Sequence, residues 1–60
     1  MLDQEQVNNV QPGDLFFSTM AGHLVLVVSC DKKLPDEICK CLECETGMIY
    51  YYVKRLFVPV

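Results

Sequence analysis

The stretch QPGDLFFSTMAGHLVLVV, residues 11–28, decides the fold of this chain. Pro12-Gly13 is a turn signal, and the Asp14 side chain can hydrogen-bond back to the turn backbone. Leu15 to Thr19 then predicts a first strand, because aromatic and apolar residues follow the turn directly. After a short link, the β-branched run from His23 to Cys30 predicts a second strand. These two predicted strands indicate a β protein.

The second half continues the pattern of short strands and turns. Ile38 to Cys44 alternates, with Lys40 on one face and Cys39 and Cys41 on the other, as in a half-buried strand. The segments that follow are a hairpin turn at residues 45–47, a returning strand at 48–53, one turn of tight helix at 54–56 and a last strand at 57–60. Pro59 fits an edge or terminal strand. The charged, proline-containing residues 31–37 predict a loop.

Five short strands with frequent turns predict an all-β chain that forms a small five-stranded barrel or a sandwich. Closing a sheet on itself removes the exposed edges that promote aggregation. Residues 1–9 are polar and rich in amides, and we expect a short N-terminal arm or a single helical turn with only Leu2, Val7 and nearby Val10 to bury. The expected organisation is an arm at 1–9 and one barrel domain at 10–60.

Composition limits the function classes. The chain has 60 residues, 52% of them hydrophobic and 22% charged, which is typical of a globular protein and not of a disordered one. The net charge of −3 argues against binding along a nucleic-acid backbone, which needs a positive surface. The first ten residues lack the pattern of a signal peptide. The longest apolar run, Leu24 to Val28, is far shorter than the roughly 20 residues that span a bilayer, so no membrane partner is expected.

The span from Val10 to Val60 resembles the small SH3-like barrels found among short bacteriophage-encoded proteins. The matching pieces are Pro12-Gly13-Asp14-Leu15, Gly22 to Val28, Cys39 to Leu42, Gly47, Tyr50 to Tyr52 and Leu56-Phe57-Val58. The resemblance implies an SH3-like barrel and a phage-encoded product, either a virion accessory protein or an inhibitor of a host protein. It implies a location in the host-cell cytoplasm or the virion. Because this fold carries many unrelated activities, it says little about mechanism.

A second resemblance covers only residues 10–30 and concerns the NlpC-type peptidoglycan hydrolases. In that family a PGDL turn and an aromatic strand precede a strand that opens with the catalytic histidine. Val10 to Val28 is similar to that segment, and His23 stands in the place of the histidine. The resemblance implies that His23 would be the base of a cysteine hydrolase.

The cysteine that such a mechanism needs is missing from its expected place. The family's nucleophile lies at a helix N-terminus upstream of the turn, and this chain has no cysteine before Cys30. Cys30 follows His23 by seven residues, which is roughly 23 Å along an extended strand. We expect their side chains on opposite faces of the sheet. The sequence therefore predicts no catalytic residues and no enzyme, with His23 half-exposed at the start of a strand and a degenerate hydrolase fragment as the alternative.

The four cysteines, Cys30, Cys39, Cys41 and Cys44, allow three interpretations. Four thiolates could form a tetrahedral zinc site, although only Cys41 and Cys44 have the C-x₂-C spacing of a zinc knuckle. Disulfides would allow three connectivities. We expect instead that the cysteines are reduced, metal-free small hydrophobic residues in the core, and that the protein needs no cofactor.

The residues Leu42, Tyr50, Tyr51 and Tyr52 are the candidates for a protein-binding surface. Neighbouring strand residues alternate between faces, so either Tyr51 or the pair Tyr50 and Tyr52 must point outward. Leu42 shares its face with Lys40 and should lie outside. Such a surface would bind a protein partner or a second copy of the chain. The alternatives are stacking on nucleic-acid bases and simple solvent-exposed tyrosines, while Lys32-Lys33 is expected to be a solvated loop pair.

Overall fold

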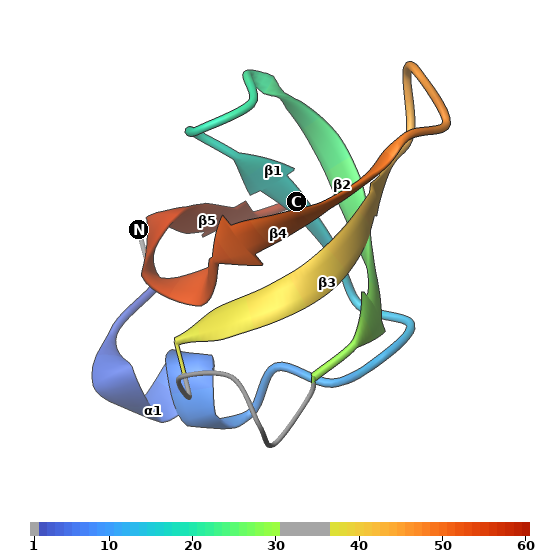
Figure 1. Cartoon of the computed structure of the whole chain (residues 1–60). Coiled ribbons are helices and arrows are strands. Elements are labelled where there is room, and N and C mark those ends of the chain that lie inside the picture. The colour runs from blue at the N-terminus through green and yellow to red at the C-terminus, as the bar shows by residue number, and fades with distance from the viewer. Residues whose placement is uncertain (1, 31–36) are drawn as a thin grey trace.

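Five antiparallel strands form one sheet in the order β4-β3-β2-β1-β5 (Figure 1). The computed structural model describes residues 2–30 and 37–60. The elements are α1 (Gln4–Asn8), β1 (Leu15–Ser18), β2 (His23–Ser29), β3 (Ile38–Glu43), β4 (Ile49–Val53), the 3₁₀ turn η1 (Lys54–Leu56) and β5 (Phe57–Pro59). The chain is mostly β, with little helix, as the sequence predicted.

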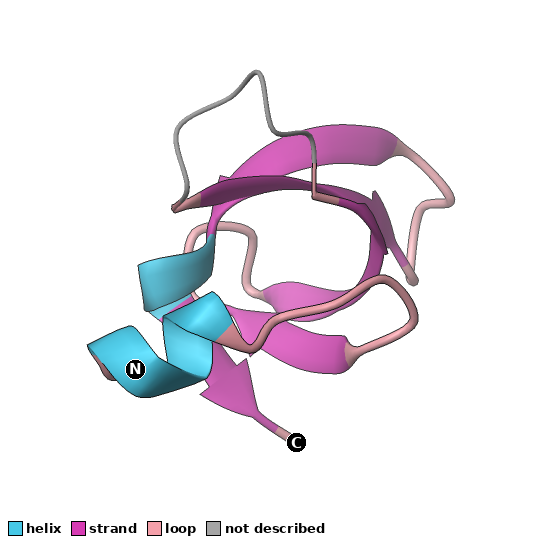
Figure 2. Cartoon of the chain, turned by 90° about the horizontal axis from the view of Figure 1, so that it is seen from below, coloured by secondary structure: helices cyan, strands magenta, loops and turns pink. Residues whose placement is uncertain are grey.

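The sheet cannot be flat, because η1 connects its two edge strands. Four strand spacings of about 4.8 Å separate the outer strands of a flat five-stranded sheet by about 19 Å. The four residue steps from Val53 at the end of β4 to Phe57 at the start of β5 span at most about 14 Å of extended chain. The sheet therefore curves around the core (Figure 2), with one concave inner face and one convex outer face.

The turn at residues 11–14 has the hydrogen bonds that the sequence predicted. The backbone N–H of Gln11 donates to the Asp14 carboxylate at 2.9 Å, and the N–H of Asp14 donates to the Gln11 carbonyl at 3.1 Å. Gly13 has a φ of 96°, a conformation that glycine adopts without strain. Its N–H donates to the Val27 carbonyl at 2.8 Å, so the turn is fastened to β2.

A β-bulge interrupts the pairing of β2 with β3. Val27 pairs with Cys41 but Ser29 pairs with Lys40, so Val28 is the extra residue on β2. An extra residue changes the parity of every later side chain on its strand. Cys30 consequently packs against the core instead of pointing away from it. The prediction that His23 and Cys30 face opposite sides of the sheet is therefore wrong.

The core lies on the inner face of the sheet and is closed at one end by the N-terminal segment. Its buried hydrophobic residues are Leu2, Val7, Val10, Val25, Val27, Cys39, Cys41, Tyr52 and Phe57. The ring of Phe57 is fully buried and stacks on Phe16 with 5.0 Å between the ring centroids.

Residues 2–10 are thus more firmly integrated than a loose arm would be. Asp3 and Gln6 form a reciprocal capping box at the start of α1, with 2.9 Å from each backbone N–H to the other side chain. Arg55 of η1 donates from Nη2 to the Gln4 side chain at 2.9 Å. The helical turn expected here is present, and all three expected apolar residues, Leu2, Val7 and Val10, are buried.

The other predicted elements are found with small shifts of their ends. The hairpin between β3 and β4, the tight turn at 54–56 and the edge position of Pro59 are all present. The predicted loop at 31–37 lies outside the described residues except for Glu37, and so do Lys32 and Lys33.

Replacing Val7 with Ala should lower the free energy of unfolding by about 2 kcal/mol. The Val7 side chain is 1% exposed, and removing two buried carbons costs about 0.8 kcal/mol each plus a cavity contribution. Urea denaturation followed by circular dichroism measures the change. The exposed neighbour Asn8→Ala is the control and should change the unfolding free energy by no more than about 0.5 kcal/mol. Equal effects of the two substitutions would show that the N-terminal segment does not share the core.

Candidate functional site

The outer face of the sheet is apolar across its whole width. The pairing register aligns Leu15 with Leu26, Leu26 with Leu42, and Leu42 with Ile49, so one apolar row crosses four strands. A second row pairs Val58 with Phe17 and Phe17 with Leu24, and Tyr51 lies opposite Lys40. We define the outer face by the residues Leu15, Phe17, Leu24, Leu26, Val28, Lys40, Leu42, Ile49, Tyr51 and Val58.

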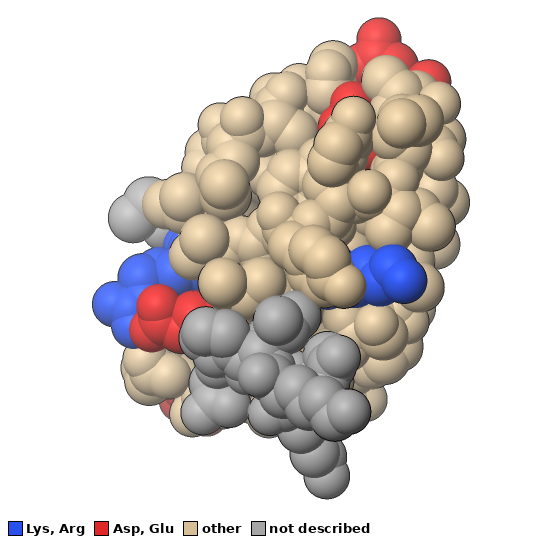
Figure 3. Space-filling view, in the orientation of Figure 1, with Lys and Arg blue, Asp and Glu red and all other residues tan. Residues whose placement is uncertain are grey.

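Most of these side chains are open to solvent. Tyr51 is 57% exposed and Ile49 is 50% exposed, while Leu24 and Val28 are each 41% exposed. Lys40 is the single charged residue of the set. The view over β3 and β4 accordingly shows a broad uncharged surface with charged side chains toward its margins (Figure 3). Large exposed apolar patches are found at protein or membrane interaction sites, in ligand-binding grooves and on aggregation-prone surfaces.

The four residues that the sequence suggested for a contact surface lie on two different faces of the sheet. Leu42 lies on the outer face, as expected, and is half-buried. Of the two orientations left open for the tyrosines, the structure has Tyr51 on this face. Tyr50 and Tyr52 share the other face and meet edge to face with 6.2 Å between ring centroids. Tyr50 is 48% exposed, but Tyr52 is only 6% exposed. Tyr52 is therefore a core residue, and its side chain is not available on the surface.

A polar cluster centred on Glu43 lies at the end of the sheet, and the sequence patterns did not single it out. Glu43 is 7% exposed, and its Oε2 accepts a hydrogen bond of 2.9 Å from the Tyr52 hydroxyl. The Nε2 atom of His23 lies 3.6 Å from Oε1 of the same carboxylate. The alternation that places Cys39 and Cys41 inside also places Glu43 inside, which was the available signal. Among the described residues, every buried side-chain nitrogen and oxygen has a hydrogen-bond partner.

The hydroxyl of Tyr52 is held in its neutral form by this environment. Burial, followed by the hydrogen bond to Glu43, raises the pKa of Tyr52 to about 12. Both effects oppose a second negative charge beside a buried carboxylate.

His23 lies at the start of β2 with its side chain 36% exposed, beside a hollow of about 390 Å³. Cys44 and Glu45 also line this hollow. The Nδ1 atom of His23 faces the Glu45 carboxylate, and its Nε2 atom faces the Glu43 carboxylate. Since both ring nitrogens face carboxylates, neither is directed at a thiol, as a cysteine hydrolase would require. His23 thus connects β2 to Glu43 at the end of β3 and to Glu45 in the turn that follows.

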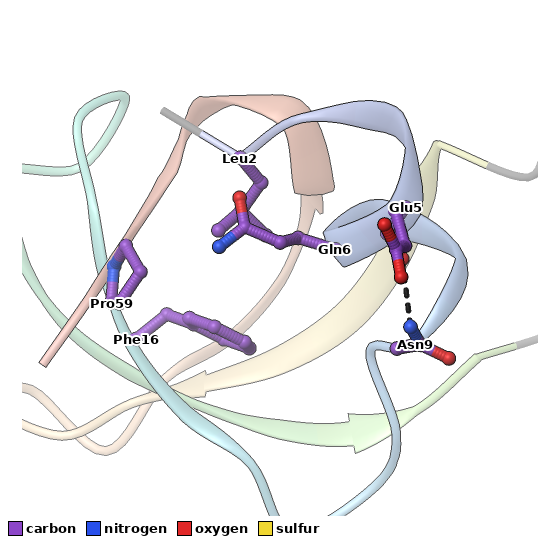
Figure 4. A pocket seen from close by; sticks show the side chains of 6 residues that line it. All are labelled: Leu2, Glu5, Gln6, Asn9, Phe16 and Pro59. Atoms are coloured by element: carbon purple, nitrogen blue, oxygen red, sulfur yellow. Dashed lines mark hydrogen bonds between the residues drawn. The ribbon is translucent and has the colours of Figure 1, made fainter.

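A second hollow, of about 340 Å³, lies between α1 and strands β1 and β5 (Figure 4). Leu2, Phe16 and Pro59 form its apolar side, and Glu5, Gln6 and Asn9 contribute polar groups from the helix. The side-chain oxygen Oε1 of Gln6 already accepts a hydrogen bond from the backbone N–H of Asp3 in the capping box. Among the described residues that line this hollow, Glu5 is the one ionisable side chain, so they do not provide the paired groups that acid–base catalysis uses.

The cysteines occupy three environments. Cys39 and Cys41 are fully buried with 3.4 Å between their sulfur atoms, Cys30 is half-buried, and Cys44 is exposed. Cys39 and Cys41 therefore point inward, as the alternation predicted. In residues 2–30 and 37–60, no group of three or more His, Cys, Asp or Glu side chains is arranged to hold a metal ion.

Positive charge is sparse on the described surface. Lys54 is 8% exposed, and Arg55 forms an ion pair with Glu37. Of the basic residues in the described ranges, this leaves only Lys40 on the outer face. No continuous basic path of the kind that follows a phosphate backbone is present there.

No protein-family model matches the chain, and no curated protein or solved structure matches it either. Within the described ranges, none of the helices has the length and apolar character needed to cross a membrane.

Tyr52→Phe should lower the free energy of unfolding by about 1–3 kcal/mol, because the buried Glu43 carboxylate loses its hydroxyl donor. Thermal and urea denaturation at neutral pH measure the loss. Tyr51→Phe is the matched control, since the hydroxyl of this 57% exposed residue faces water, and it should leave stability unchanged. A loss of similar size in both variants would contradict the proposed role of the Tyr52–Glu43 hydrogen bond.

The stability that Tyr52 contributes should also depend on alkaline pH. Its folded pKa of about 12 lies above the ordinary value of 10.0. The contribution is therefore complete below pH 10 and is lost as the pH rises from about 10 to about 12. Urea denaturation should show the stability difference between the wild-type chain and Tyr52→Phe shrinking over this interval. A difference that stays constant through the interval would contradict the raised pKa.

Proposed function

We propose that this chain is a non-enzymatic protein-binding domain that makes its contact through the outer face of the sheet. The observation that carries the proposal is the apolar row from Leu15 through Leu26 and Leu42 to Ile49. A sheet with one face in water normally alternates apolar and polar residues. Here both faces of β2 are apolar, although within residues 2–30 and 37–60 only the inner face is covered by the chain itself.

The composition of the outer face supports a protein as its occupant. Aromatic and aliphatic side chains dominate, and a single lysine provides charge, which is the pattern of an interface core with few charged groups. Tyr51 is suited to be an anchor, because its large ring is more than half exposed and lies beside Lys40. Either a second copy of the chain or a larger protein would cover this face.

The proposed architecture is a small SH3-like barrel. The curved five-stranded sheet, the turn at residues 11–14 and the 3₁₀ turn before the last strand support it. The resemblance to phage-encoded barrels supports a phage-encoded product that works in the host-cell cytoplasm or on the virion. A virion accessory protein and an inhibitor of a host protein would both use an apolar contact surface of this kind.

Nucleic-acid binding has less support than protein binding. Base stacking could use Tyr50 and Tyr51, but it also needs cations near the rings. Lys54 is buried and Arg55 is paired with Glu37, so neither serves this purpose. The net charge of −3 opposes the approach of a polyanion.

Self-association is the first test of the proposed contact. Sedimentation equilibrium from micromolar to millimolar concentration should show an oligomer that Tyr51→Ala weakens about tenfold or more, the effect of losing an aromatic anchor. Leu42→Asp, which places a charge within the apolar row, should weaken it further. Val60→Ala is the control, because Val60 is 76% exposed and lies outside the outer face.

Circular dichroism must show that each variant is still folded before its oligomeric state is compared. A chain that remains monomeric at millimolar concentration and is also fully stable alone would contradict the proposed interface. A monomer of low stability would direct the search to a larger protein partner.

The absence of hydrolase activity is a separate expectation. Purified protein should release no fragments from peptidoglycan, because both nitrogens of His23 face glutamates. Turnover that disappears in His23→Ala and persists in the exposed-site control Asn9→Ala would show that the chain is an enzyme.

A further inference from the structure

The bulge in β2 brings a half-buried thiol opposite a buried one. Ser29 pairs with Lys40, and continuing this antiparallel register by one residue sets Cys30 opposite Cys39. Both side chains point to the inner side of the sheet, where Cys30 packs on the core. A sulfur contact of 3.7 Å from Cys30 to the Val10 carbonyl holds the Cys30 side chain in place.

This position suits a disulfide better than the other close pair of thiols does. Directly opposed residues of antiparallel strands have Cα atoms about 4.5–5.5 Å apart, within the usual disulfide range of about 4.4–6.8 Å. Cys39 and Cys41 are two residues apart on one strand, so their Cα atoms are about 6.6 Å apart, near the upper limit of this range. Their Cβ atoms point the same way and are therefore also about 6.6 Å apart, well beyond the roughly 3.5–4.5 Å between the Cβ atoms of a disulfide. Their sulfur atoms are 3.4 Å apart, but bonding them would distort β3.

The surroundings provide access and positive charge. Cys30 is half-buried, whereas Cys39 and Cys41 are fully buried, so a small reagent reaches Cys30 first. Burial raises the pKa of Cys30, and the nearby Lys54 ammonium opposes this rise. The hydrogen bond between Cys39 and Cys41 raises the pKa of Cys39 and lowers that of Cys41.

We propose that Cys30 and Cys39 are an oxidisable pair that low-molecular-weight disulfides convert into a cross-strand disulfide between β2 and β3. This modification site is independent of the proposed protein contact, because both thiols lie on the inner side of the sheet.

The reaction is two successive thiol–disulfide exchanges. The Cys30 thiolate attacks one sulfur of a small disulfide RSSR, whose S–S bond breaks and releases one RS⁻. The Cys39 thiolate then attacks the Cys30 sulfur of the mixed disulfide and releases the second RS⁻. The two protein protons go to the two leaving thiolates, so RSSR is reduced to two RSH while Cys30 and Cys39 are oxidised.

Incubation of the full chain with glutathione disulfide tests the proposal. We expect the loss of two hydrogens per chain by mass spectrometry, a Cys30–Cys39 linkage in non-reducing peptide maps and a higher melting temperature than that of the reduced chain. The melting temperature should rise because the bond constrains the unfolded chain. Dithiothreitol should reverse all three changes.

Single substitutions identify the pair. Cys30→Ser should abolish the internal disulfide, whereas Cys44→Ser should leave it unchanged, because Cys44 is exposed and lies in the turn beyond the opposite end of β3. Cys41→Ser should also retain it. A Cys39–Cys41 linkage, mixed disulfides that never resolve, or oxidation only between chains would overturn the proposal. The wild-type peptide map decides the question even where a variant fails to fold.

Discussion

The pairing of β2 with both β1 and β3 is the interaction on which the rest of the structure depends. β2 is the central strand of the order β4-β3-β2-β1-β5, and it has the longest run of paired residues. Its inner side chains, Val25 and Val27, are almost completely buried, and the turn at residues 11–14 is hydrogen-bonded to its backbone. Its outer side chains align the apolar row. One strand therefore organises the core, the first turn and the candidate contact surface.

The short link through η1 is the second constraint. Because so few residues connect the two edge strands, the sheet has to curve, and its inner face encloses a small volume. Small cysteine side chains occupy much of that volume along β3, and Phe57 and Tyr52 enter it from the strands on either side of the link. The Tyr52 hydroxyl then reaches Glu43, which lets this carboxylate be buried with its charge hydrogen-bonded.

A chain of this size has little hydrophobic core to spare, since small domains bury a smaller share of their surface than large ones. Yet many large apolar side chains of this chain are on the outer face of the sheet. A partner that covered this face would add the burial that the fold alone does not supply. Oxidation of Cys30 and Cys39 would act on a different part of the molecule, where β2 and β3 come together at the core.

The sequence by itself determined the strands and turns. Through the alternation of side chains it also determined, for most strand residues, which residues share a face of the sheet. Gly and Pro turns, β-branched runs and the lysine between two cysteines were enough to predict five strands, an inward Cys39 and Cys41, and an outward Leu42. Alternation also placed Tyr51 on the face opposite to Tyr50 and Tyr52, without deciding which of the two faces is outside. Local periodicity carries this information because neighbouring strand residues must point to opposite faces. For residues 1–9 the sequence left a loose arm and a single helical turn as alternatives, and the capping box of Asp3 and Gln6 was found only in the structure.

Tertiary structure alone decided the features that depend on contacts between distant residues. The bulge at Val28 arises from pairing with β3, and it reversed the predicted orientation of Cys30. Tyr50 and Tyr52 share one face, and only their position along the curved sheet leaves Tyr50 exposed while Tyr52 enters the core. The meeting of His23 with Glu43 likewise depends on the register of β2 against β3. Periodicity specifies which face a side chain occupies, but curvature and register decide what covers that face.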